Sequence, residues 1–398
     1  FLARGGALAL ALGAVGPFLA ACGSSETTPT GGGSGTQSDP TTPTTASTSS
    51  PPATSPAAGG SSGIPELSSV PEALKGSGEV RIATAGGALA EAERKAYFEP
   101  FTRLTGIKVV EVEGFSAAQV KTQVDSNNVQ WDVVGFDYLN ALNLLKQGDY
   151  FEEIDYDLID TDNIDESQQH QFGVGYLQVG TVMCYRTDEF GGKVPQGWAD
   201  FWNLDEFPGP RNWMSGSLGI APFLEGALLA DGVPMDQLYP LDIQRALDSL
   251  TKIRDNIVKF WESGAQSAQL MADKETVMGV AWNGRIATIQ DDGAPVDIQW
   301  NQAMVVVDSL VIPKGAKNVE NARKLIAFMT LPIPQAHMSS LIPYGFTNRA
   351  AAEYLPEDVL ARLPSAPQYR DKVFYSNSAW WADNLEAAIE AWTEWSLT

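Results

Sequence analysis

The chain has few of the residues that build disulfide frameworks and zinc sites. Its 398 residues include two cysteines, Cys22 and Cys184, and two histidines, His170 and His337. The histidines lie far apart, with no cysteine or carboxylate at metal-ligand spacing around them, so we expect no zinc site. Cys184 lies in an apolar stretch, 179–185, where a lone thiol is expected to be a small core residue.

Cations are also scarce. Lysine and arginine total 26 against 49 aspartates and glutamates, which gives a formal net charge of −23, and no basic cluster stands out. Nucleic acid is therefore not an expected partner. The sequence also lacks a glycine-rich phosphate loop and a nucleophile-elbow motif. It gives no support to nucleotide or hydrolytic chemistry, and we expect no cofactor.

One long segment has no large apolar residue. Residues 23–63 contain no aromatic residue, lysine or arginine and are almost wholly Ser, Thr, Pro, Gly and Ala. Such a composition cannot bury enough apolar surface to offset the entropy cost of ordering the chain. We expect a disordered tether over 22–78, ahead of a globular body that begins at 79.

The segment before the tether is apolar and short. It runs over 5–21, follows Arg4, and ends in small residues, which is typical of a secretory signal. Leu19-Ala20-Ala21-Cys22 resembles the lipobox of bacterial lipoproteins. The resemblance implies that a signal peptide, 1–21, is removed and that the Cys22 sulfur carries a lipid. It also implies anchoring to the outer face of the cytoplasmic membrane, in the periplasm or at the cell surface.

The first part of the body alternates between strand and helix patterns. We expect strands at 79–84, 107–113 and 131–135, and helices at 89–104, 117–126 and 140–148. This alternation predicts an α/β fold with a mostly parallel sheet and right-handed crossovers. Ligands bind beyond the carboxyl ends of such strands, here at 84–87, 114–116 and 136–138.

The rest of the body continues less regularly. We expect strands at 180–185, 277–282 and 303–312, and helices at 198–202, 242–263, 320–329, 333–341 and 380–395. A body of roughly 320 residues is too long for one ordinary core and predicts two domains.

Six segments resemble the extracytoplasmic solute-binding proteins of ABC importers, and among them the spermidine/putrescine-binding branch. They are TGIKVVEVEG (105–114), WDVVGFD (131–137), GWADFW (197–202), VAWNGR (280–285), VDSLVIPKGAKN (307–318) and IPYGFTN (342–348). The resemblance implies a monomer with two α/β lobes of the type II periplasmic-binding-protein fold. A small solute binds between the lobes, and an ABC permease with its ATPase is the partner.

The resemblance also implies lobe boundaries. Lobe one would comprise 79–176 plus 307–348, and lobe two 177–306 plus 349–398. The chain would cross the hinge near 175–181 and again near 300–308.

Five residues are candidates for ligand contact. Asp308 lies within the otherwise apolar run 305–310, and a buried carboxylate needs a partner, which could be a ligand, a helix end or an internal arginine. In the polyamine binders the matching aspartate pairs with the ligand's ammonium. Trp282 and Tyr344 match aromatic residues of the family's cleft, although Trp282 could instead be a core residue. Asp137 and Tyr138 lie where the third strand ends.

The chain departs from the polyamine binders in two places. Those proteins carry a tryptophan two residues before the aspartate, where this chain has Val306, and an acid in the segment corresponding to 217–224, which here has no carboxylate. Glu225 could substitute for that acid. These departures favour a smaller or singly charged amine, an amino-acid derivative or an opine-like conjugate. Thiamine or ferric iron are alternatives in the same transport role.

Two other functions remain open. A secreted hydrolase could use Asp291 and Asp292 as paired carboxylates, but these precede Gly293 in a pattern typical of a turn. A surface adhesin could use the aromatic residues for contact, but most of the tryptophans lie in helical patterns typical of a core. We therefore expect a binding protein and no enzyme activity.

Overall fold

The computed structural model describes residues 63–114, 116–218 and 220–398. These residues lie in one compact unit. The expected signal peptide, Cys22 and the tether up to residue 62 lie outside the described residues.

The first group of strands forms a parallel sheet, as its alternating pattern predicts. Its strands are β1 (Glu79–Thr84), β2 (Lys108–Glu113) and β3 (Val133–Asp137), with β1 in the middle. The helices between them are α1 (Gly87–Glu93), α2 (Glu99–Thr105) and α3 (Ala117–Asp125). A π-helical turn, Arg94–Phe98, joins α1 to α2, so the expected helix at 89–104 is continuous but not uniformly α-helical.

A second parallel group lies farther along the chain. It consists of β7 (Arg211–Met214), β8 (Ile257–Trp261) and β9 (Met278–Trp282), with β7 in the middle. Its helices are α5 (Trp198–Trp202), α6 (Glu225–Ala230), α7 (Ile243–Thr251), α8 (Gly264–Ala272) and α9 (Asn283–Asp291).

The expected helix at 242–263 is wrong in its second half. Helix α7 ends at Thr251, and β8 begins at Ile257. The buried residues of β8, Ile257 and Trp261, are four positions apart, a spacing that fits a helix as well as a strand, and pairing with β7 decides for a strand.

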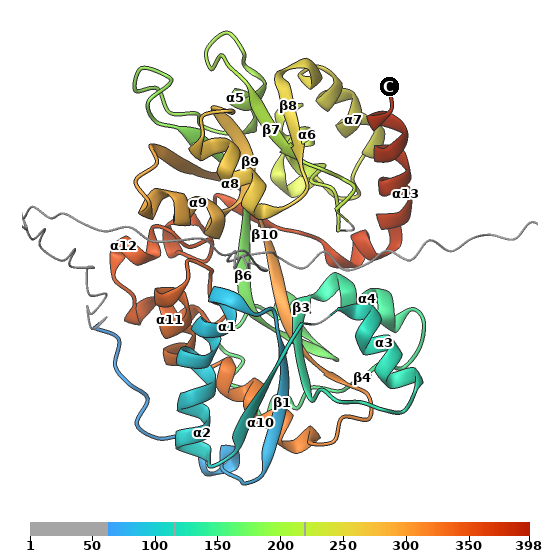
Figure 1. Ribbon diagram of the computed structural model, residues 1–398, viewed down its shortest axis with the longest axis vertical. Helices are drawn as coiled ribbons and strands as arrows, with labels where there is room; N and C mark the ends of the chain where they lie inside the picture. The colour runs from blue at the N-terminus through green and yellow to red at the C-terminus, as the bar shows by residue number, and fades with distance from the viewer. Residues whose placement is uncertain (1–62, 115, 219) are drawn as a thin grey trace, which may run out of the picture. The chain divides into compact units, whose positions relative to one another are not determined.

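Two long antiparallel strands join the two groups. They are β6 (Gly173–Arg186) and β10 (Val296–Pro313), and the sheet order is β2-β1-β3-β10-β6-β9-β7-β8. Strand β3 flanks β10, and β9 flanks β6, so each parallel group borders one end of the same β6–β10 ladder (Figure 1). We call the β1–β3 side the first lobe and the β7–β9 side the second lobe. The antiparallel ladder makes the sheet mixed rather than mostly parallel.

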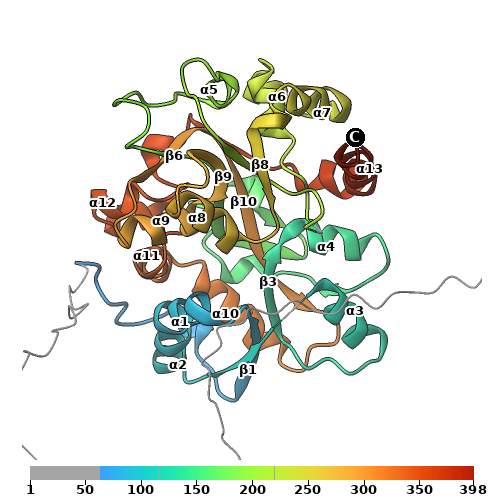
Figure 2. The same cartoon turned by 45° about the horizontal axis from the view of Figure 1, so that its top comes forward.

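The remaining elements extend the two lobes. They are β4 (Phe151–Glu152), β5 (Gln169–His170), β11 (Val373–Tyr375), α4 (Tyr138–Leu145), α10 (Val319–Met329), α11 (Pro332–Leu341), α12 (Glu357–Leu360) and α13 (Ser378–Ser396). Figure 2 shows α4 of the first lobe lying near α13 of the second. Lys146, just after α4, donates hydrogen bonds to the Ala382 carbonyl and the Asp383 carboxylate of α13.

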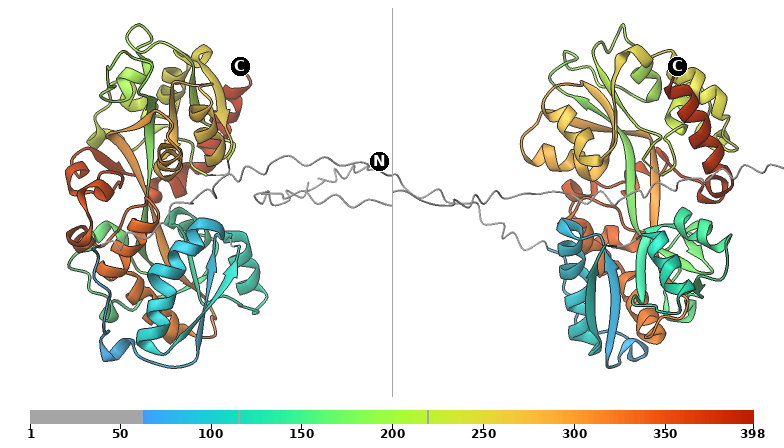
Figure 3. Two further views of the ribbon diagram at one scale, coloured as in Figure 1. Left: turned by 60° about the vertical axis from the view of Figure 1, so that its left-hand side comes forward. Right: turned by 45° about the vertical axis from the view of Figure 1, so that its right-hand side comes forward.

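The apolar core is divided in the same way as the strands. One cluster surrounds β7–β9 and includes Trp198, Trp213, Trp261 and Trp381. Another surrounds β1 and α2 and includes Phe101. Most tryptophans are thus core residues of the second lobe, as their helical spacing predicts. Figure 3 shows the two helix-covered halves with β6 and β10 between them.

The body begins before residue 79. Ile64, Val70 and Leu74 are buried against the first lobe. The segment 64–78, which we call the strap, also accepts hydrogen bonds at the Lys75 carbonyl from Lys324 and at the Ser77 carbonyl from Asn321, both on α10. Ordered packing of the strap therefore differs from the disorder expected up to residue 78.

Other sequence expectations concern single groups. Cys184 is fully buried, and its thiol donates a hydrogen bond to the Gly279 carbonyl at 3.3 Å, which confirms a core role. Asp291 closes α9 and pairs with Arg362 at 2.9 Å, so it belongs to a helix end rather than to a turn alone. Over the residues described, no helix combines the length and apolarity needed to cross a membrane.

Candidate functional site

Asp308 lies where β10 passes from one lobe to the other. It stands opposite Asp137 in the β3–β10 ladder, and a register shift after Asp308 interrupts the pairing with β6. Its carboxylate makes no hydrogen bond or ion pair with any residue the structure describes. Burial, aided by the charge of Asp137, raises the pKa of Asp308 to about 7. A desolvated carboxylate with no partner in the chain favours an external cation.

Asp137 has a structural role beside Asp308. It is the N-cap of α4, and its Oδ1 accepts a hydrogen bond from the Leu139 backbone N–H at 2.9 Å. Burial raises the pKa of Asp137 to about 6. The residue therefore adds negative charge to the Asp308 site, although one of its oxygens is already engaged.

A third carboxylate, Glu93 at the end of α1, lies close enough for the Asp308 charge to act on it. Glu93 is 4% exposed, and its Oε1 accepts a hydrogen bond from the Tyr176 hydroxyl at 3.2 Å. Burial raises the pKa of Glu93 to about 8, and the charges of Asp308 and Glu111 add to this. Gly135 of β3 leaves room for Tyr176, since a Cβ there would lie 2.7 Å from the tyrosine hydroxyl. The sequence analysis did not single out Glu93.

Trp282 and Arg285 lie side by side where β9 passes into α9. Trp282 is half-buried and packs edge-to-face on Trp261, with ring centroids 5.5 Å apart. A Cβ at Gly264 would lie 2.6 Å from the Trp282 ring and 3.1 Å from Arg285 Nε, so this glycine gives both side chains room. Arg285 is exposed and forms no ion pair or hydrogen bond with any described residue.

The residues on either side of Tyr344, Pro343 and Gly345, hold it in place through hydrogen bonds. Gly345 exchanges two backbone hydrogen bonds with Gln178 of β6, at 2.8 and 2.9 Å. The fully buried Asn283 donates from Nδ2 to the Pro343 carbonyl at 2.6 Å, and its Oδ1 accepts from the Gly180 N–H at 2.9 Å. These contacts tie the start of α9 and the Tyr344 loop to the strand that joins the lobes.

Charges of both signs act on the Tyr344 side chain. It packs against Gly284, where a Cβ would lie 2.7 Å from the ring. Burial raises the pKa of the Tyr344 phenol, and Arg285 lowers it while Asp308 raises it. The phenol is therefore within electrostatic reach of an anion on β10 and a cation on α9.

The structure thus links four of the five candidate residues. Asp308, Asp137 and Tyr344 interact electrostatically or through strand pairing, and Trp282 adjoins Arg285, which acts on Tyr344. Tyr138 does not join this group. Its ring stacks on His170, with centroids 3.7 Å apart, and lines a cavity of about 490 Å³ together with Val307 of β10 and Tyr239 of the second lobe.

Glu225, considered as a second ligand carboxylate, is engaged inside the second lobe. It is fully buried, and its Oε1 accepts hydrogen bonds from the Tyr239 hydroxyl at 2.5 Å and from Trp381 Nε1 at 2.9 Å. Val306 packs against the core of the same lobe. In this structure Glu225 therefore faces core residues, with no contact to Asp308, Tyr344 or Trp282.

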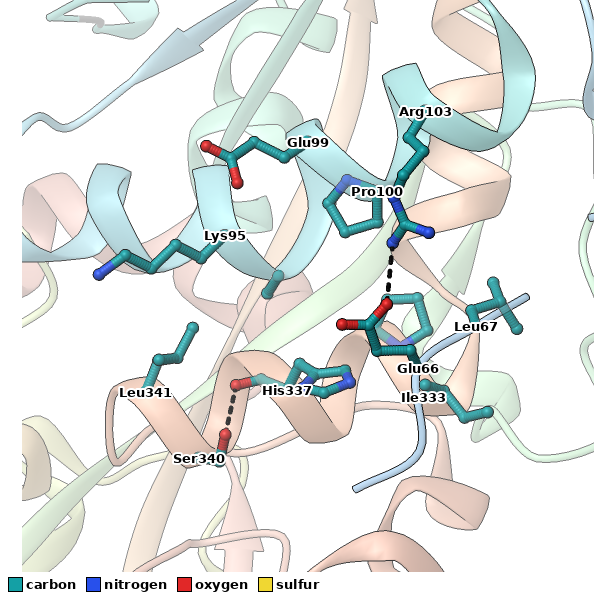
Figure 4. A pocket seen from close by; sticks show the side chains of 12 residues that line it. Glu66, Leu67, Lys95, Glu99, Pro100, Arg103, Ile333, His337, Ser340 and Leu341 are labelled. Atoms are coloured by element: carbon teal, nitrogen blue, oxygen red, sulfur yellow. Dashed lines mark hydrogen bonds and ion pairs between the residues drawn. The ribbon is translucent and has the colours of Figure 1, made fainter. Parts of the chain in front are cut away.

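A different cavity, of about 500 Å³, lies beneath the strap. Figure 4 shows it between the strap, α2 and α11, where Glu66 pairs with Arg103 at 3.5 Å. His337 of α11 lies 3.2 Å from the Pro65 carbonyl. The cavity mixes both signs of charge and involves the first lobe alone, so it does not offer a solute contact with both lobes. Within the described ranges, no group of three or more His, Cys, Asp or Glu side chains could hold a metal ion.

Comparison with known proteins reveals clear relatives. The chain is 35% identical to the gamma-aminobutyric acid-binding protein of Pseudomonas aeruginosa over 326 residues, covering 79% of this chain and 91% of that protein. It is 26% identical to the spermidine/putrescine-binding periplasmic protein of Escherichia coli over 298 residues, covering 72% and 82%. An ABC transporter substrate-binding protein from Bradyrhizobium japonicum matches with a TM-score of 0.74 and 35% identity, covering 80% of this chain and 99% of that one.

These relatives are solute-binding proteins of transporters and not enzymes, and the solved one shares the two-lobed fold. The family model described as bacterial extracellular solute-binding protein matches residues 96–368. The chain belongs to this family, as the substrate-binding protein of an ABC transporter for a small solute.

Proposed function

We propose that the protein binds a small zwitterionic amine, of which 4-aminobutanoate (GABA) is the simplest example, and delivers it to a membrane permease. The observation that carries this proposal is that the buried Tyr344 phenol is within electrostatic reach of both the Asp308 carboxylate and the Arg285 guanidinium. An ammonium group would pair with Asp308, and a carboxylate a few bonds away would pair with Arg285. Trp282 would pack against the alkyl chain between them.

The charges favour a zwitterion over a long polyamine. A second ammonium placed near Arg285 would meet a like charge, and segment 217–224 supplies no carboxylate to receive it. Bringing an unpaired ammonium out of water costs several kcal/mol, which is more than the about 1–2 kcal/mol that an aromatic face returns. The relative named for gamma-aminobutyric acid is also the more similar of the two curated relatives reported above.

Binding would work by closure of the two lobes. We propose that the hinge is the part of the β6–β10 ladder near 177–181 and 304–308, because β3 flanks β10 from Asp308 and β9 flanks β6 from Thr181. Asp308 is on this ladder, whereas Arg285 and Trp282 belong to the second lobe. A solute that contacts both would stabilise the closed form, which the permease would recognise.

The lobe boundaries remain a proposal with one adjustment. Leu355 and Leu363 pack with Ala336 of α11 and with Phe346, so the first lobe's packing extends beyond residue 348. We also propose that Cys22 carries a lipid anchor, which the Leu19-Ala20-Ala21-Cys22 pattern supports.

Calorimetric titration of the purified protein tests the proposed solute class. We expect micromolar or tighter binding of 4-aminobutanoate and much weaker binding of putrescine and spermidine. Sub-micromolar binding of spermidine with no binding of 4-aminobutanoate would overturn the zwitterion proposal. In that event a carboxylate in the second lobe, with Glu225 first, would have to serve the distal ammonium.

A further inference from the structure

We infer that Glu93 is a second carboxylate of the ammonium site, and that one proton shared by Glu93 and Asp308 leaves the protein when a primary ammonium binds. The inference rests on the proposed function, because it assumes an amine solute. It adds a residue, a proton balance and a requirement for N–H donors on the solute.

The first support is the position of Glu93. The residue is 4% exposed and is held by the hydroxyl of Tyr176, which is itself 3% exposed. Asp308 pairs with Leu177 in the β6–β10 ladder, next to Tyr176, and the charge of Asp308 acts on both Glu93 and Tyr176. The second oxygen of Glu93, Oε2, has no hydrogen-bond partner among the described residues.

The second support is that no lysine or arginine among the described residues pairs with Glu93 or Asp308. Arg94 is committed to Glu111 through two hydrogen bonds, from Nε at 2.7 Å and from Nη2 at 2.8 Å. Lys95 pairs with Glu91 at 2.7 Å. The side chains of Arg94 and Lys95 are both exposed, on the outer side of the helix.

The groups that do act on the pair are acids or neutral hydroxyls. Glu93 is affected by Tyr176 of β6, Asp308 of β10 and Glu111 of β2. On the same helical segment as Glu93, the charge of Glu93 raises the pKa of Tyr97. Asp308 is affected by Asp137.

Two desolvated carboxylates without a cation do not both ionise, because the second charge is repelled by the first. Burial accordingly raises the pKa of Glu93 to about 8 and that of Asp308 to about 7. The empty site therefore holds a proton near neutral pH.

The proton balance follows. Before binding, one carboxyl of the pair is protonated and the other is ionised. The incoming ammonium carries one positive charge and offers three N–H donors. It stabilises both carboxylates in the ionised form, and the displaced proton passes to the buffer. The only covalent bond broken is the O–H bond of the protonated carboxyl.

The need for N–H donors on the solute also defines the class of solute. Asp308, Glu93 and the Tyr344 hydroxyl provide acceptors for the three N–H groups of a primary ammonium. A trimethylated nitrogen has the same charge but no donor, and it would leave the carboxyl oxygens unpaired. We therefore expect selectivity for 4-aminobutanoate over its N,N,N-trimethyl analogue.

Calorimetry in two buffers tests the inference. The wild-type protein is titrated with 4-aminobutanoate near neutral pH in phosphate and in Tris, which differ strongly in ionisation enthalpy. We expect the observed heat to depend on the buffer in the sense of proton release. The variant Glu93→Gln keeps the shape and can accept from Tyr176, but it should lose the buffer dependence. The matched control Glu91→Gln, an exposed acid of the same helix, should keep it.

The outcomes separate the inference from the proposed function. Binding with heats equal in both buffers overturns the inference and leaves the proposed function standing. Unchanged proton release in Glu93→Gln, or tight binding of the trimethyl analogue, also overturns it. Absence of binding by any amine overturns both. The wild-type buffer comparison needs no variant, so a folding defect in Glu93→Gln does not prevent a decision.

Discussion

Asp308 and Asp132 are both aspartates of the first lobe, but they have different surroundings. Asp132 is 1% exposed and accepts hydrogen bonds from the Arg81 N–H and from the backbone and side-chain N–H groups of Asn318. Asp308 has no such partner within the described chain. A carboxylate satisfied by the fold stabilises it, whereas an unsatisfied one is available to a ligand and costs stability until the ligand arrives.

Replacing each aspartate by asparagine should therefore give opposite results. Asp308→Asn should weaken 4-aminobutanoate binding by about 2–5 kcal/mol, because it removes the charge that the ammonium pairs with. The stability of the empty protein should stay the same or rise. Asp132→Asn should lower stability and leave affinity unchanged. Titration calorimetry and thermal melting measure the two quantities. A large stability loss with unchanged affinity in Asp308→Asn would instead identify a structural aspartate.

Arg285 should distinguish solutes that carry a carboxylate at the end opposite the ammonium from solutes that do not. Arg285→Gln should weaken 4-aminobutanoate binding by about tenfold or more, since a charge-assisted hydrogen bond to the solute carboxylate is lost. The affinity for putrescine, which has no carboxylate, should not fall. Arg245→Gln serves as the control, because Arg245 lies in the same lobe and pairs with Asp231 on the surface. An equal loss for both solutes would show that Arg285 does not bind the carboxylate.

At the level of elements, the local hydrophobic pattern predicted the helix and strand bounds wherever it fitted only one period, that of a helix or that of a strand. Strand β1 begins and ends where its alternation predicts, and α10 and α13 differ from the expected helices by one or two residues. The pattern failed at β8, where a helix and a strand fit equally well and a non-local partner, β7, decided. The lengths of β6 and β10 were underestimated, because their pairing with each other extends across both lobes.

The site was predictable to the extent that each residue carried its own signal. Asp308 interrupts an apolar run, and Trp282 and Tyr344 lie in segments that resemble the family. Glu93 was harder to find, although its spacing from Leu89 and Ala96 puts it on the inner side of the expected helix. Its significance depends on a contact with β6 and β10, which no local pattern encodes.

Asn283 connects three elements and should affect both stability and binding. Asn283→Ala would leave the Gly180 N–H and the Pro343 carbonyl without the hydrogen bonds they now have. We expect a loss of about 1–3 kcal/mol in unfolding free energy for each buried group left unpaired. Solute affinity should fall as well, because the Tyr344 loop loses a support. Denaturant unfolding and calorimetry measure these effects, with the exposed Asn128→Ala as control. Unchanged affinity would show that the Gly345–Gln178 contact alone fixes Tyr344.

For the molecule as a whole, the buried acids determine how stability depends on pH. Burial raises the pKa values of Asp137, Asp308 and Glu93 to about 6, 7 and 8. Between their unfolded values and these values the native state binds more protons than the unfolded state, so stability falls as pH rises. Burial lowers the pKa of His170 from 6.5 to about 4, so its contribution has the opposite sign: stability is lost as pH falls below about 6.5.

We therefore expect the melting temperature of the empty protein to fall by several degrees between about pH 5 and about pH 8. The double variant Glu93→Gln/Asp308→Asn should flatten this dependence, and saturating 4-aminobutanoate should flatten it in the wild type. Glu91→Gln should behave like the wild type. A melting temperature that rises over this range in the wild type would contradict the assigned protonation of the site.

The proposed anchor should be separable from the binding function. Residues 23–63 lie between Cys22 and the first buried side chain of the strap, Ile64, and no site residue lies among them. Cys22→Ser should therefore release the protein from membranes and leave solute affinity unchanged. Membrane fractionation and calorimetry measure the two effects. Loss of binding in the released protein would show that the segment before the strap contributes to the site.

The contacts of the strap determine which part of the molecule bears tension applied to the N-terminal chain. It is fastened to α10 by Lys324 and Asn321 and packs against the core of the first lobe, away from β7–β9. Tension on the chain before residue 64 would be borne by these contacts and would not stretch the β6–β10 ladder. With the proposed anchor and hinge, the first lobe would be the one held by the N-terminal chain, and the second lobe would move relative to it. The proposed opening and closing would then require the same solute concentration whether or not the N-terminal chain is under tension.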